Sequence, residues 1–131
     1  MKFLFAWFVL GGSRDLLKPY AYVEGAHGQK NMLCQLLGDD GGCGLNHHLW
    51  MLDDLLQDVV DVRNRVSDSC TWEGEVWRAD ISREAVKIYY QHDESDFEYF
   101  DFSTLEVVLS AWIPFLRSTP SVESKAEVLV V

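Results

Sequence analysis

Residues 72–102 decide the fold, and they read WEGEVWRADISREAVKIYYQHDESDFEYFDF. Apolar and polar side chains alternate along this stretch with a period of two, which is the pattern of strands that bury one face. The alternation predicts strands over 72–81, 85–91 and 96–102. The segments that join them are as short as the connections of β-hairpins. We therefore expect an antiparallel meander of three strands.

A long helix is expected before the meander, over residues 46–66. Its apolar residues recur at the spacings of the buried side of an amphipathic helix. They are Leu45, Leu49, Leu52, Leu56, Val59 and Val66. A separate polar stripe holds Asp54, Asp58, Asp61 and Arg65. One side of this helix should therefore pack on the core, and the other should present acidic groups to water.

A second helix is expected after the meander, over residues 103–116. Ser103 and Glu106 have the spacing of a capping box, in which two side chains satisfy free N–H groups at a helix start. The apolar face that follows holds Leu105, Val108, Leu109, Trp112, Phe115 and Leu116. Pro114 falls late in the segment and should kink or shorten the helix end.

The N-terminal third gives weaker patterns. The aromatic-rich run at residues 3–10, followed by Gly-Gly-Ser, predicts a buried strand and its turn. A secretory signal that is removed would share the shape of residues 1–12, so that alternative stays open. Residues 14–44 predict only a helical turn or two at 33–37, with Asn31 as the cap and a stop at the glycine that follows.

Together these segments predict an α+β fold, in which helices cover one face of an antiparallel sheet. The sheet would contain the three-strand meander and the N-terminal strand. Residues 1–117 would form a single domain of ordinary size. Residues 118–131 are expected to be a flexible C-terminal tail, although Val128–Val131 could pair with a sheet edge or a partner.

Composition excludes several classes of protein. The chain has 131 residues, a formal net charge of −10 and a sequence pI near 4.6. Its 48% hydrophobic and 13% aromatic content suits a packed core rather than a disordered acidic chain. The negative charge would repel nucleic acid and anionic membranes, so neither is expected as a partner. An odd number of cysteines, three, argues against a disulfide framework and favours a reducing cytoplasm.

No motif predicts catalysis or metal binding. The residues nearest to such a motif are Cys34, Cys43, His47 and His48. They lack the close cysteine pairs of structural zinc sites, and adjacent histidines point apart on a helix. The loop residues 39–42 lack the alternating oxygen ligands of a calcium site, and no local signature marks a cysteine nucleophile. We expect no catalytic residue, cofactor or metal; a small Cys/His enzyme or metal-binding protein stays an alternative.

The clearest functional signal is the acidic segment at residues 92–101. Five of its ten residues are acids and none is a base, whereas the other 121 residues hold 16 acids, so the segment is enriched about fourfold. The five acids are Asp93, Glu94, Asp96, Glu98 and Asp101. Strand alternation puts Asp96 and Glu98 on one face. Such a face would attract a basic protein, with Tyr89 and Trp72 as possible anchors.

Two other interpretations of the charge stay open. Hairpins and edge strands also carry charge in order to stay soluble and to block edge-to-edge pairing. The helix stripe of Asp54, Asp58 and Asp61 is a second candidate patch for the same kind of partner.

The second half of the chain resembles a protein family. Residues 72–81, residues 85–90, the acidic segment and the helix that ends Ala-Trp-Ile-Pro-Phe-Leu look like the closing half of small bacterial immunity proteins. These are the antidotes of contact-dependent growth inhibition and related polymorphic toxin systems. The likeness covers the 45 residues 72–116 and is one of pattern, without a diagnostic motif.

The resemblance implies a cytoplasmic protein that is not an enzyme and that neutralises one toxin domain in a 1:1 heterodimer. The toxin in such systems is often a nuclease acting on RNA or tRNA. A nuclease that grips phosphates must be basic, so an acidic inhibitor can cover its cleft. The remaining alternative is a structural or oligomeric module that pairs through the C-terminal residues or an exposed strand.

Overall fold

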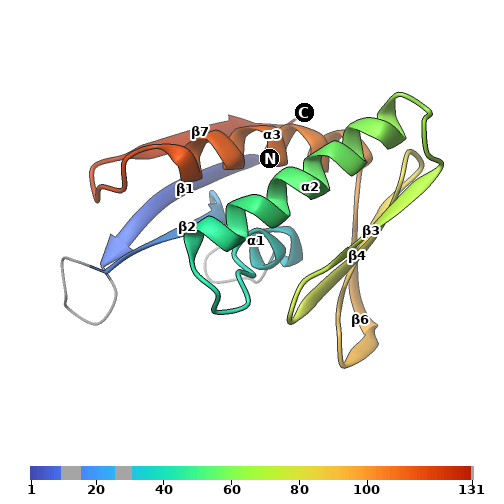
Figure 1. Ribbon diagram of the computed structural model, residues 1–131, viewed down its shortest axis with the longest axis horizontal. Helices are drawn as coiled ribbons and strands as arrows, with labels where there is room; N and C mark the ends of the chain where they lie inside the picture. The colour runs from blue at the N-terminus through green and yellow to red at the C-terminus, as the bar shows by residue number, and fades with distance from the viewer. Residues whose placement is uncertain (10–15, 26–30, 131) are drawn as a thin grey trace.

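The computed structural model of the chain describes residues 1–9, 16–25 and 31–130, and it has an α+β fold with antiparallel strands. The strands form two sheets, and three helices pack on them (Figure 1). The expected fold class, the N-terminal strand and both long helices are confirmed. Within the described residues, no helix is both long and apolar enough to cross a bilayer.

The first sheet brings the two ends of the chain together (Figure 1). Its strand order is β2-β1-β7. The strands are β1 (Lys2–Val9), β2 (Leu17–Val23) and β7 (Lys125–Leu129). In the central strand, every second residue from Phe3 to Trp7 is a buried aromatic, as the aromatic run predicts, and Ala6 between them is buried as well. The Gly-Gly-Ser turn expected after β1 lies outside the described residues.

β7 corrects the prediction of a flexible tail over 118–131. Val128 lies opposite Phe3, and Ala126 lies opposite Phe5. The N–H of Val130 donates to the carbonyl of Met1 over 2.8 Å, and the Met1 amine donates back over 2.9 Å. The apolar C-terminal residues therefore pair with a sheet edge, which is the alternative that their composition left open; Val131 lies outside the described residues.

The second sheet is a meander of four strands rather than three. In order across the sheet, the strands are β3 (Ser69–Glu73), β4 (Trp77–Ser82), β5 (Val86–Tyr90) and β6 (Asp93–Phe100). The single strand predicted at 72–81 is therefore wrong, because a turn at 74–76 divides it. The expected pairing with the N-terminal strand is also absent from this sheet, since β1 belongs to the other one.

The turn at 74–76 is set by a residue far away in the sequence. The carboxylate of Asp39 accepts the N–H groups of Val76 and Trp77 over 2.9 and 3.0 Å. A Cβ on Gly74 would lie 2.8 Å from the Trp77 carbonyl oxygen and would also collide with that carboxylate. The turn thus needs both a glycine and a distant anion, and alternation alone could not predict it.

The first two helices are α1 (Met32–Leu37) and α2 (Leu45–Arg63). α1 begins as predicted, since the Asn31 side chain accepts the N–H of Cys34 over 3.1 Å. α2 ends three residues earlier than predicted because Arg65 adopts the left-handed conformation, with φ 63°. The N–H of Val66 then bonds back to the Asp61 carbonyl. Val66 is consequently 73% exposed and lies off the apolar face where the spacing put it.

α3 (Phe102–Arg117) does not use the predicted capping box. Its N-cap is Asp101, whose side chain makes no capping hydrogen bond, so Ser103 lies inside the first turn. Glu106 instead forms an ion pair of 2.8 Å with Arg63 at the end of α2. The helix also continues past Pro114 to its end at Arg117.

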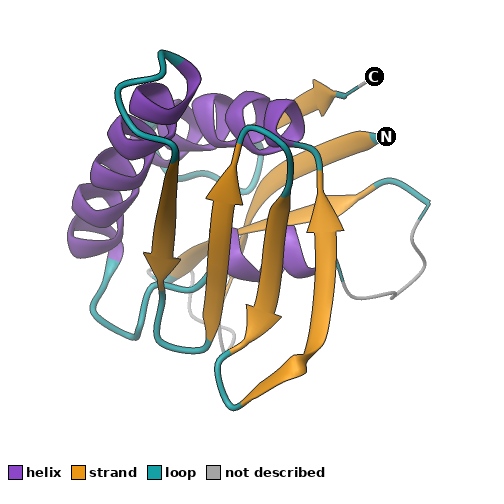
Figure 2. Cartoon of the chain, turned by 90° about the vertical axis from the view of Figure 1, so that its right-hand side faces the viewer, coloured by secondary structure: helices purple, strands orange, loops and turns teal. Residues whose placement is uncertain are grey.

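One hydrophobic core joins both sheets and the three helices. At its centre, the carbonyl of Leu37 accepts two donors, His48 Nε2 at 2.7 Å and Trp112 Nε1 at 3.0 Å. The last carbonyl of α1 would otherwise lack an intrahelical partner, and here it connects α2 and α3. Figure 2 places the four-stranded sheet in front of the helices, so one sheet face packs on them and the other is open.

Candidate functional site

The acids of residues 92–101 do not form one surface. In the β5–β6 pair, Glu98 lies opposite the fully buried Ile88, and Phe97 lies opposite Tyr89. Opposed residues share a face of a sheet. Glu98 is therefore on the face that packs on the helices, and Phe97 is on the open face.

Glu98 and Asp96 share a face, as predicted, but it is not the open one. Glu98 Oε1 accepts the N–H of Met32, the first residue of α1, over 3.0 Å. Both acids line a hollow of about 360 Å³ together with Met32 and Trp77. The Glu98 carboxylate thus satisfies a free N–H at a helix start, which is a structural role.

The other three acids of the segment lie in three different places. Asp93 accepts the N–H of Ser95 over 3.1 Å at the start of β6. Glu94 lies 3.5 Å from Lys87 Nζ and forms an ion pair with it. Asp101 is exposed at the start of α3.

The two expected anchors separate as well. Tyr89 is on the open face, and its hydroxyl is 3.5 Å from Asp80. Trp72 is only 5% exposed and belongs to the core, so it is not accessible to a partner.

The open face of the second sheet is of mixed charge rather than acidic. Its aromatic residues are Tyr89, Phe97 and Tyr99, and the last two are exposed. The ammonium of Lys87 lies 4.9 Å from the Phe97 ring centre and 5.4 Å from that of Tyr89. Arg78 sits beside Tyr89 on the adjacent strand. These two cations offset the nearby acids.

The predicted second patch, in contrast, is continuous. Asp54, Asp58 and Asp61 recur at helical spacing along the water-facing side of α2. No Lys or Arg occurs in the helix before Arg63. One turn before Asp54, the indole of Trp50 is 63% exposed. Sequence reasoning missed this tryptophan, although its place on the polar stripe is a signal that could have found it.

A hollow of about 400 Å³ extends this acidic stripe at the start of α2. It lies between the loop after α1, the first turns of α2 and the β3–β4 turn. Its described lining contains four carboxylates and no Lys or Arg; the acids are Asp39, Asp40, Glu73 and Glu75. His47 also lines the hollow, and its ring centre is 5.8 Å from that of Trp50.

We call this combined region the α2 acidic surface. It consists of Trp50, Asp54, Asp58 and Asp61 together with the four acids of the hollow. Asp58 also influences the Cys70 thiol on β3 of the second sheet. The pKa of this thiol is raised to about 11, mainly by burial and secondly by the negative charge of Asp58. The surface therefore spans the helix, a loop and the edge of a sheet.

Cys43 and His47 both line the hollow at the start of α2, whereas Cys34 and His48 are buried. All three cysteines are free thiols, and burial raises the pKa of Cys34 to about 12, which disfavours the nucleophilic thiolate. Cys43 is exposed, and its Sγ is 3.6 Å from the Gly41 carbonyl. In the part of the chain that the structure describes, no three His, Cys, Asp or Glu side chains are grouped to hold a metal ion.

Comparison with known proteins yields no relative, since no family model, no curated protein and no solved structure matches the chain.

Proposed function

We propose that this chain is an immunity protein that binds a basic toxin domain through the α2 acidic surface. The observation that carries the proposal is the exposed Trp50 in a row of carboxylates that contains no base. Carboxylates accelerate the encounter with a cationic partner, and an exposed tryptophan is the side chain that most often anchors an interface. The pairing of both features on one rigid helix supports a protein-binding role.

The acidic segment 92–101 is the weaker site under this proposal. Glu98 and Glu94 already have partners within the chain, at Met32 and Lys87. A toxin would have to displace those contacts, whereas Asp54 and Asp58 are exposed and make no side-chain hydrogen bond or ion pair with the described residues.

The immunity role itself rests on the resemblance of residues 72–116 to antidotes of polymorphic toxin systems. Under this proposal the protein acts in the cytoplasm, has no catalytic activity and forms a 1:1 complex. The proposed toxin is a nuclease, because a nuclease must present a basic cleft to phosphates and the −10 charge complements it. RNA or tRNA is the substrate that the resemblance implies.

Co-expression with the product of the neighbouring toxin gene tests the proposal. We expect this chain to restore growth and to elute with the toxin as a 1:1 complex that weakens as salt is added. A neighbouring gene that encodes no toxin, or a toxin that remains active and unbound, would contradict it.

An oligomeric module is the second candidate, and one observation favours it. The outer face of the first sheet carries three exposed aromatic rings: Phe8 is 5.1 Å from Tyr20, and Tyr20 is 5.3 Å from Tyr22, between ring centres. Light scattering decides between the two. A dimer that dissociates in a Tyr20→Ser/Tyr22→Ser variant would favour the module, and a monomer would count against it.

A further inference from the structure

We propose that a pocket between the first sheet and the start of α2 binds a small neutral molecule with an apolar body and one hydrogen-bond donor, such as an alcohol or a phenol. This site is separate from the toxin-binding proposal and does not depend on it.

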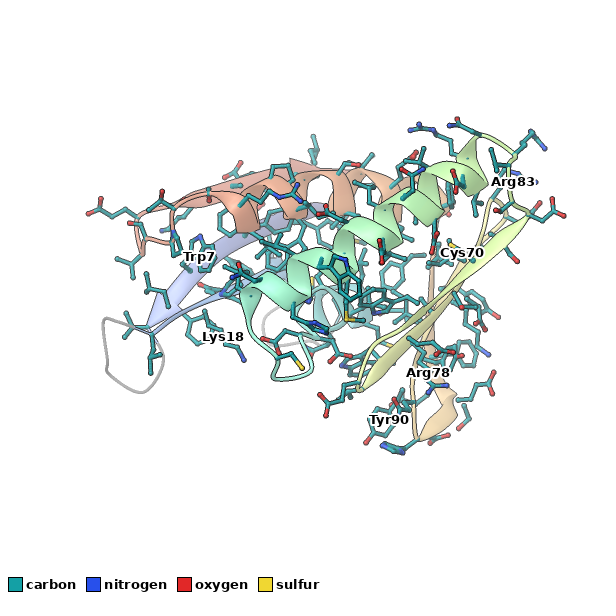
Figure 3. The ribbon with its side chains drawn as sticks, viewed as in Figure 1. Trp7, Lys18, Cys70, Arg78, Arg83 and Tyr90 are labelled. Carbon is teal, nitrogen blue, oxygen red and sulfur yellow. The ribbon has the colours of Figure 1, made fainter. Side chains whose placement is uncertain are left out.

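The pocket has a volume of about 260 Å³ and a mostly apolar wall. Segments from several parts of the chain meet there: Trp7 of β1, Leu17 of β2, Leu45 and His48 of α2, and Pro120 from the link before β7. Figure 3 shows Trp7 and Lys18 near the first turn of α2. Pockets for drug-sized ligands have volumes of about 300–1,000 Å³, so this one suits a molecule with a single ring.

His48 contributes an uncharged polar group to the pocket wall. Its side chain is 3% exposed, and its Nε2 is 2.7 Å from the carbonyl of Leu37. A carbonyl can only accept, so Nε2 carries the hydrogen. In a neutral imidazole the other nitrogen, Nδ1, is then an acceptor, and it has no hydrogen-bond partner among the described residues.

The ring is neutral at neutral pH because burial lowers the pKa of His48 below its ordinary value of 6.5. A bare acceptor in an apolar wall favours a ligand that donates a hydrogen bond.

The charged residues of the lining select against charged ligands. The described lining holds one charge of each sign, Lys18 and Asp40, so its formal net charge is zero. One carboxylate oxygen of Asp40 already accepts the N–H of Gly42 over 2.8 Å. A neutral molecule therefore fits the lining better than an anion or a cation does.

Two probes of equal size test the assignment of His48. 4-Methylphenol carries a hydroxyl where 1,4-dimethylbenzene carries a methyl, and binding is measured at pH 7.5 from the methyl NMR signals of Leu17 and Leu45. With the acceptor in place, we expect the phenol to bind about 3- to 10-fold more tightly than the hydrocarbon. Tighter or equal binding of the hydrocarbon would overturn the proposal, as would the absence of binding by both probes.

Filling the pocket tests its position. Leu45→Trp adds an indole inside the pocket, whereas Asn46→Trp adds the same group at the next, exposed position. We expect the first variant to lose binding of 4-methylphenol and the second to keep it. If Leu45→Trp does not fold, Leu17→Phe fills the opposite wall. Retention of binding in a folded variant of either wall would overturn the proposal.

Discussion

The two acidic regions of this protein look alike in sequence and differ in space. Residues 92–101 hold more acids per residue than α2, yet these acids lie on different faces of β6 and at its two ends. α2 holds fewer, but Asp54, Asp58 and Asp61 fall on one exposed stripe with Trp50. Charge density along a sequence therefore does not measure charge density on a surface.

The difference follows from the period of each element. Residues four and seven apart on a helix lie on the same side, so their charges add. Neighbours on a strand alternate between faces, and a register shift at Tyr89 and Tyr90 disturbs the alternation further. Asp96 and Glu98 keep a common face, but the helices cover most of it.

Charge reversal should produce the largest difference in toxin affinity between the two acidic regions. Asp54→Lys/Asp58→Lys places two cations in the α2 acidic surface, and we expect about a 100-fold loss of affinity for the toxin because like charges then meet. Asp93→Lys/Glu94→Lys makes the same net change at the hairpin and should cost about fivefold or less, through long-range attraction alone. Titration calorimetry at fixed salt measures both; equal losses would refute the distinction.

Removal of one aromatic ring from each region should have the next largest effect. Trp50→Ala is expected to weaken toxin binding about 30-fold, the cost of roughly 2 kcal/mol that is typical of a central anchor. Phe97→Ala removes an exposed ring from the open face of the second sheet and should change affinity little. A larger loss from Phe97→Ala would move the interface to that sheet.

Glu98 should matter for stability rather than for binding. Glu98→Ala removes the acceptor of the Met32 N–H, and we expect the free energy of unfolding to fall by about 1–2 kcal/mol. Asp96→Ala on the same face is the matched control and should change it by less than about 0.5 kcal/mol. Urea denaturation gives both values. An unchanged midpoint for Glu98→Ala would contradict the structural role of Glu98, and this acid would again be a candidate for toxin binding.

The smallest effect should be a pH dependence that originates at the start of α2. Because burial lowers the pKa of His48 in the fold, the unfolded chain binds a proton more readily between that pKa and 6.5. The free energy of unfolding should thus decrease as pH falls from 7.5 through 6.5. His48→Gln keeps an N–H donor for Leu37 without titrating, so its decrease over the same range should be smaller. Thermal melts at pH 7.5 and 5.5 compare the two proteins, and identical decreases would contradict this role.

Local signals in the sequence were enough to predict much of the fold. The spacing of α2, the Asn31 cap of α1 and the aromatic run of β1 each depend on neighbouring residues. The elements that the sequence did not predict depend on residues that are distant in the sequence. The turn at 74–76 needs Asp39, and β7 is ordered by its pairing with β1.

The candidate site divides in the same way. The α2 stripe could be predicted because helical spacing alone brings its aspartates together. The positions of the acids in residues 92–101 could not be predicted, because they depend on the β5–β6 register and on where α1 places the N–H of Met32. Trp72 illustrates the limit, since alternation could not say that its ring faces the core.

The most direct test of the central claim is an NMR titration of the ¹⁵N-labelled chain with the toxin that we propose the neighbouring gene encodes. The account predicts that the Trp50 indole signal and the amides of residues 46–62 and 73–76 shift and saturate at one equivalent, while those of residues 93–101 stay in place. Shifts confined to residues 93–101, with the Trp50 indole unmoved, would contradict it.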